Sequence, residues 1–115
     1  AFVAETDAAI RAQIAGVQFV TFGHMGDSNL HYNVQAPTGT DPAAFLRRHE
    51  TTVNALVFDA VRRFGGSISA EHGIGQLKRD ILPRYQSPVA LGMMRTIKQA
   101  LDPKNTMNPG KMLSL

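Results

Sequence analysis

The chain has 115 residues, and 43% of them are hydrophobic. A chain of this length and composition can form one domain with a single modest core, but it is too short for two domains. Twelve Lys and Arg outnumber nine Asp and Glu, but the basic residues are scattered as pairs without aromatic neighbours that could stack on bases. We therefore expect no nucleic-acid partner.

Cysteine is absent, which excludes disulfides, thiolate metal sites and a cysteine nucleophile. No apolar run approaches the roughly 18 residues of a membrane span, and no segment has the pattern of a signal peptide. We expect a cytoplasmic protein without a membrane span. Because the chain begins without Met or a helix cap, we also expect it to be a piece of a longer protein.

The first half of the chain predicts a helix followed by a β-hairpin. Residues 2–14 carry apolar side chains at helical spacing and precede Gly16, a typical helix end. Residues 17–22 are rich in β-branched and aromatic side chains, and Leu30 to Val34 alternate with polar partners. A tight turn at residues 25–28 would join these two strands.

The hairpin would gather polar side chains on one face. If Leu30, Tyr32 and Val34 point into a core, the side chains of Asn29, His31 and Asn33 project from the opposite face. His24 would then lie opposite Asn29 and diagonal to His31, with about 7–8 Å between the histidine Cβ atoms. The two imidazoles could share a metal ion, although a catalytic zinc normally has a third protein ligand. Either histidine alone is more simply read as an ordinary surface or core residue.

The second half predicts two more helices and a third strand. Asp41-Pro42 is a strong helix start, and the following apolar stripe ends at Gly65-Gly66. Residues 67–70 are expected to return to the sheet as a short strand, and residues 76–82 to form a helical turn closed by Pro83. A last helix would run from Ser87-Pro88 to Asp102-Pro103, before an irregular tail.

This order of elements predicts an α+β fold with helices on one face of a small, mostly antiparallel, ferredoxin-like sheet, as a fragment of a larger domain. At the end of the expected third strand, Glu71 and His72 offer a carboxylate and a further imidazole. Neighbours in an extended chain point in opposite directions, so Glu71 could complete a metal site while His72 acts as a general base. An ordinary surface strand end remains an alternative at this position.

Three segments in this order resemble the C-terminal cap region of FAD-linked 2-hydroxy acid oxidoreductases, a family that includes D-lactate dehydrogenase, the glycolate oxidase flavin subunit and D-2-hydroxyglutarate dehydrogenase. They are residues 23–33 (GHMGDSNLHYN), 69–78 (SAEHGIGQLK) and 101–111 (LDPKNTMNPGK), and together they span most of the chain. Ser28 departs from the resemblance, because the family usually has Gly at that position.

The resemblance implies a role for each matching residue. His24, His31 and Glu71 would bind zinc or another divalent metal, and His72 would take the hydroxyl proton as hydride passes to the flavin. Asn33 and His72 would contact the substrate, a D-2-hydroxy acid such as D-lactate, glycolate or D-2-hydroxyglutarate. Asn108 and Gly110 would contact FAD.

The resemblance also implies that a missing N-terminal domain holds most of the FAD. Residues 1–115 would then be the C-terminal part of the enzyme and inactive alone, with homodimer formation left open. A free-standing metal- or small-molecule-binding module is the main alternative. A zinc hydrolase would fit the ligand set, but the chain lacks the usual His-Glu-x-x-His helix.

Overall fold

The computed structural model describes residues 1–114, with Met25 described by its backbone alone. It contains two compact units, residues 1–70 and residues 71–115, which we treat separately. The first unit holds α1 (Phe2–Gln13), β1 (Gln18–His24), η1 (Met25–Asp27), β2 (Asn29–Gln35) and α2 (Pro42–Arg63). The second unit holds α3 (Leu82–Tyr85) and α4 (Pro88–Leu101).

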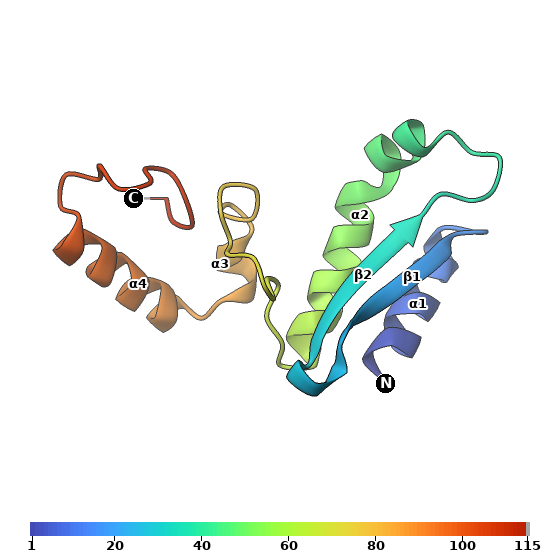
Figure 1. Ribbon diagram of the computed structural model, residues 1–115, viewed down its shortest axis with the longest axis horizontal. Coiled ribbons are helices and arrows are strands. Elements are labelled where there is room, and N and C mark those ends of the chain that lie inside the picture. The colour runs from blue at the N-terminus through green and yellow to red at the C-terminus, as the bar shows by residue number, and fades with distance from the viewer. Residues whose placement is uncertain (115) are drawn as a thin grey trace. The chain divides into compact units, whose positions relative to one another are not determined.

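The first unit is an antiparallel hairpin of β1 and β2 with both long helices on one face (Figure 1). Ile10, Ile14 and Val17 are buried at its centre. Packed against them are partly buried side chains from both strands and from α2: Phe19, Tyr32, Val34, Phe45, Val53, Leu56 and Val57. The expected α+β class, with helices on one face of an antiparallel sheet, is confirmed.

Local sequence signals explain where the helices begin and end. The Asp41 carboxylate accepts hydrogen bonds from the backbone N–H groups of Ala43 and Ala44, both at 3.2 Å, and so caps α2. At the start of α4, the Ser87 hydroxyl accepts a bond of 3.1 Å from the Ala90 N–H. Gly16 follows α1 with φ +74°, a backbone conformation that favours glycine.

Two local predictions are wrong. Residues 67–70 form no strand, so the sheet of the described residues has two strands rather than three. In this segment the Ser67 hydroxyl donates to the Ser69 carbonyl and accepts from the Ser69 N–H, local bonds that compete with pairing to a neighbouring strand. Pro83 does not close a helix either; it lies in the first turn of α3, where its missing N–H costs no hydrogen bond.

The second unit is held together by contacts between α4 and the irregular segments around it. Leu82, Leu91 and Leu113 are its buried apolar side chains. The Arg79 guanidinium donates to the Gly110 carbonyl at 3.0 Å, and the Met112 N–H donates to the Gly75 carbonyl at 2.6 Å. These bonds tie the C-terminal tail to the loop that follows Glu71.

Candidate functional site

The hairpin places its histidines as the sequence predicts. His24 pairs with Asn29, and His31 pairs with Phe22 across the two strands. Opposite residues share a face and successive residues alternate, so His24, His31 and Asn33 lie on the face turned away from the helices. The expected diagonal relation between His24 and His31 is confirmed.

Contacts on this face fix the side chains around His31. The Phe22 ring stacks on the His31 imidazole, with 5.0 Å between centroids and 16° between planes. A stacked imidazole keeps its two nitrogens at the edge of the ring pair rather than between the rings. Phe22 is 57% exposed, so this aromatic wall is open to a ligand. Sequence reasoning missed Phe22, although the predicted register already placed it opposite His31.

Asn33 lies two residues further along the same face. Its Nδ2 donates to the Val20 carbonyl at 3.2 Å, which anchors the carboxamide on the neighbouring strand. The Asn33 side chain is exposed, and its carbonyl oxygen can accept a hydrogen bond from a hydroxyl group. This arrangement suits a substrate contact.

The turn between the strands depends on unusual backbone. Ser28 has φ +54°, in the left-handed region that costs most residues free energy. At Gly23, an added Cβ would lie 2.2 Å from the Asn29 carbonyl oxygen. Only glycine therefore allows the two strands to approach this closely beside His24.

Glu71 and His72 begin the second unit, in an exposed segment of bends. The expected extended geometry, with the two side chains on opposite sides of a strand, is not found there. Among residues 1–114, no three His, Asp or Glu side chains form a group that could hold one metal ion. The three predicted metal ligands therefore lie in different units, His24 and His31 in the first and Glu71 in the second.

Asp102 anchors the start of the tail that carries Asn108 and Gly110 through hydrogen bonds to the tail backbone. The Asp102 carboxylate is buried and accepts bonds of 2.8 Å from the backbone N–H groups of Thr106 and Met107. Lys98 donates to the same carboxylate. The Lys98 ammonium and these N–H donors hold the pKa of Asp102 well below its usual value, because they stabilise the ionised form against burial.

Asn108 is exposed, in a turn closed by a 3.3 Å bond from the Lys111 N–H to its carbonyl. Gly110 has φ +70°, and a Cβ there would lie 3.4 Å from the Arg79 guanidinium. The turn thus exposes the Asn108 carboxamide, whereas the Gly110 carbonyl oxygen already accepts a hydrogen bond from Arg79.

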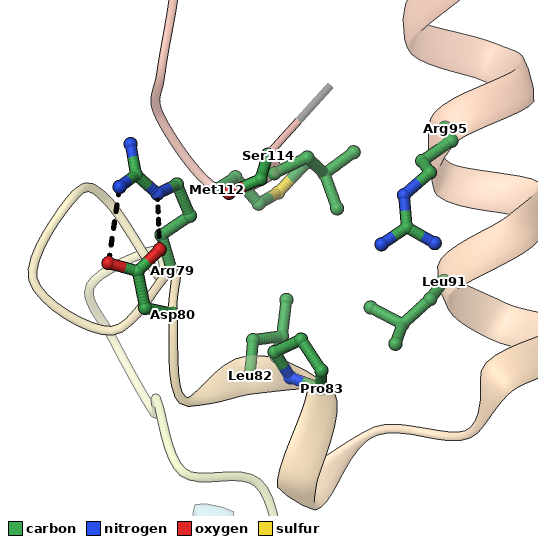
Figure 2. A pocket seen from close by; sticks show the side chains of 9 residues that line it. Arg79, Asp80, Leu82, Pro83, Leu91, Arg95, Met112 and Ser114 are labelled. Atoms are coloured by element: carbon green, nitrogen blue, oxygen red, sulfur yellow. Dashed lines mark hydrogen bonds and ion pairs between the residues drawn. The ribbon is translucent and has the colours of Figure 1, made fainter.

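A pocket of about 150 Å³ lies within the second unit (Figure 2). Leu82, Pro83 and Leu91 line its apolar side, and Arg95 points into it from α4. Arg79 also lines the pocket but is paired with Asp80 at 2.7 Å. None of the predicted site residues lines this pocket.

Comparisons with known proteins agree with this arrangement of motifs. Residues 1–112 match the family model described as FAD linked oxidases, C-terminal domain. The chain is 42% identical over 99% of its length to D-2-hydroxyglutarate dehydrogenase of Stutzerimonas stutzeri, and 45% identical over 97% to the enzyme of that name from Xanthomonas citri pv. viticola. It is 35% identical over 85% of its length to glycolate oxidase subunit GlcD of Bacillus subtilis.

These matches cover 24% of the length of the first two relatives and 20% of the third. The chain therefore spans about a quarter of the curated proteins it resembles. No helix among the described residues is long and apolar enough to cross a membrane.

Proposed function

The chain belongs to the family of C-terminal domains of FAD-linked oxidases, and from this membership we propose that it is part of a flavin-dependent enzyme that oxidises a D-2-hydroxy acid to the 2-oxo acid. Two relatives carry the name D-2-hydroxyglutarate dehydrogenase and a third is a glycolate oxidase subunit. These names share a 2-hydroxy acid substrate, which is the substrate class we propose here.

The observation that carries the proposal is the open face of the hairpin. It presents His24, His31 and Asn33 together, beside the exposed ring of Phe22. Imidazole and carboxamide groups suit the hydroxyl and carboxylate of a small 2-hydroxy acid, because they supply both donors and acceptors. The Phe22 ring excludes water from one side of a molecule bound there.

In the proposed reaction, His72 accepts the substrate hydroxyl proton on an imidazole nitrogen. Bound flavin supplies the acceptor for the hydride that leaves the α-carbon. Asn33 orients the substrate through its carbonyl oxygen. Proton and hydride leave the same carbon–oxygen unit, so the hydroxyl carbon becomes the 2-oxo carbon.

We further propose that His24, His31 and Glu71 hold a divalent metal, with zinc as the best chemical match. The hairpin fits this role in part, because it already places two imidazoles diagonally on one face. Two imidazoles and one carboxylate are a donor set that zinc accepts. Such an ion would polarise the substrate hydroxyl and ease its loss of a proton.

Asn108 and Gly110 are proposed to contact FAD. The exposed Asn108 carboxamide is a suitable hydrogen-bond partner for a cofactor, whereas the Gly110 carbonyl already accepts from Arg79. We therefore assign Gly110 a role in shaping the turn and Asn108 the direct contact. Most of the flavin contacts would come from a further domain of the same protein, and residues 1–115 alone would be inactive.

The test is His72→Gln in the full-length flavoprotein, with flavin reduction by D-2-hydroxyglutarate, D-lactate and glycolate followed by absorbance. Loss of the base should slow flavin reduction by about 10²–10⁴-fold while the flavin content stays unchanged. His49→Gln is the matched control, because His49 packs against Phe45 on α2, outside the proposed site. An undiminished rate in His72→Gln would remove His72 from the mechanism, and no reduction by any 2-hydroxy acid would refute the function.

A further inference from the structure

Helix α4 is apolar on two opposite sides. One side carries Leu91, which is 6% exposed and belongs to the core of the second unit. The other side carries four large apolar residues at a spacing of four, which we call the α4 stripe: Val89, Met93, Ile97 and Leu101. Residues four apart on a helix are neighbours, so these side chains form one continuous row.

The α4 stripe is open along its whole length. Its members are 74%, 62%, 57% and 73% exposed, in chain order. Single exposed apolar residues are common on protein surfaces, but a continuous row of four is typical of an interface.

A second row along the stripe consists of small residues. Gly92, Thr96 and Ala100 also follow one another at a spacing of four, and all three are exposed. An added Cβ at Gly92 would meet nothing within 4 Å. Small side chains beside a ridge of large ones leave a groove into which the ridge of another helix can pack.

Both ends of α4 are held in place. Ser87 caps its N-terminus, and the Asp102 carboxylate binds Lys98 and the tail at its C-terminus. The stripe is therefore carried by a helix whose ends are already hydrogen-bonded within the unit. A surface of this kind needs little ordering when a partner binds, which lowers the entropic cost of docking.

We propose that the α4 stripe is the surface on which the flavin-binding domain of the same protein docks, an inference that rests on the proposed function. The chain matches only 24% of the length of the two dehydrogenase relatives, so a protein of their length has about three quarters of its residues outside this chain. Residues 1–70 are a weaker candidate for the partner that docks on the α4 stripe. The apolar sheet face of this unit is covered by α1 and α2, and its open face carries the two histidines proposed as metal ligands.

The test compares two variants, one with a single thiol within the α4 stripe and one with a single thiol outside it. The chain has no cysteine, so Ile97→Cys and Gln99→Cys each create one thiol within residues 1–115. Both would be made in the full-length protein after replacement of any cysteines outside this region. Gln99 is the matched control, because it is an exposed polar residue on the same helix but outside the stripe. The rate of maleimide labelling under native conditions is measured for each thiol.

Docking predicts that Ile97→Cys reacts at least about tenfold more slowly than Gln99→Cys, because labelling must wait for the interface to open. Similar rates for the two thiols would overturn the proposal. A benzophenone maleimide attached at Ile97→Cys, followed by photolysis and peptide mass spectrometry, then identifies the neighbour.

A cross-link to the flavin-binding domain supports the proposal. A cross-link to residues 1–70, or to a second copy of the protein, overturns it. These readouts do not depend on turnover, so an enzyme with a protected stripe but no 2-hydroxy acid oxidation would refute the proposed function and leave the docking surface intact.

Discussion

At the scale of single residues, Tyr32 connects β2 to α1. Its hydroxyl donates to the Asp7 carboxylate at 2.5 Å, and its ring meets that of Phe2 edge to face at 6.1 Å. Burial and the neighbouring Asp7 carboxylate raise the pKa of Tyr32 far above its usual value, because both disfavour the phenolate. The contact positions α1 over the face of the hairpin opposite His31.

Tyr32→Phe should lower the free energy of unfolding at pH 7 by about 1 kcal/mol, the typical net value of such a hydrogen bond. Because the folded-state pKa of Tyr32 is raised, its contribution is fully present below the unfolded pKa of 10.0 and is lost as pH rises above that value. Urea unfolding at pH 7 and pH 11 checks both points. A mutant with the same alkaline loss of stability as the parent would show that Tyr32 is not responsible.

Ser28 stores strain in the turn of the hairpin. A left-handed conformation costs a residue other than glycine roughly 1–2 kcal/mol, and a glycine costs about 0.5–1 kcal/mol more chain entropy on folding. Ser28→Gly should therefore raise the free energy of unfolding by about 0.5 kcal/mol, measured by urea titration. Ser28→Ala keeps the strain and should give no gain; equal gains from both changes would point away from the backbone.

At the scale of elements, the hairpin is the structure that brings the histidines together. Its register pairs His24 with Asn29 and Phe22 with His31, so a shift by one residue would move these side chains to the covered face. The close approach at Gly23 helps to fix that register. The geometry of the candidate site thus depends on a residue without a side chain.

Gly23→Ala should destabilise the protein by about 2–3 kcal/mol, because its Cβ would overlap the Asn29 carbonyl and force the strands apart. Gly26→Ala is the matched control, since a Cβ there meets nothing within 4 Å. Thermal unfolding monitored by circular dichroism compares the two. If Gly23→Ala melts like Gly26→Ala, the strands do not need the close approach.

At the scale of the whole molecule, the residues of the proposed site are divided between two units. His24, His31 and Asn33 belong to the first unit, whereas Glu71, His72 and the tail belong to the second. The proposed reaction needs groups from both. Assembly of the full-length protein would therefore control activity as strongly as any single residue does.

Chelation of the full-length enzyme should reduce its activity at least about tenfold, and added zinc should restore it, because a bound ion would polarise the substrate hydroxyl. His31→Ala should have similarly low activity and no further response to the chelator. His49→Ala should keep both the activity and the chelator response of the parent. Activity that survives complete metal removal would leave His72 to act without a metal.

The sequence by itself determined the elements with local signals and the pairing within the hairpin. Asp41 and Ser87 identify two helix starts, because a capping side chain bonds the next few N–H groups wherever that segment occurs. The alternation from Leu30 to Val34 determined which face carries His31, because the period of a strand is fixed by its backbone.

The tertiary structure decided the features that depend on which of several possible groups a residue contacts. Residues 67–70 have the composition of a strand, but their backbone bonds locally instead of extending the sheet. The stacking of Phe22 on His31, the burial of Asp102 and the exposure of the α4 stripe likewise depend on which distant groups come into contact. Such contacts reflect the free energies of many alternative neighbours, and no local sequence pattern contains them.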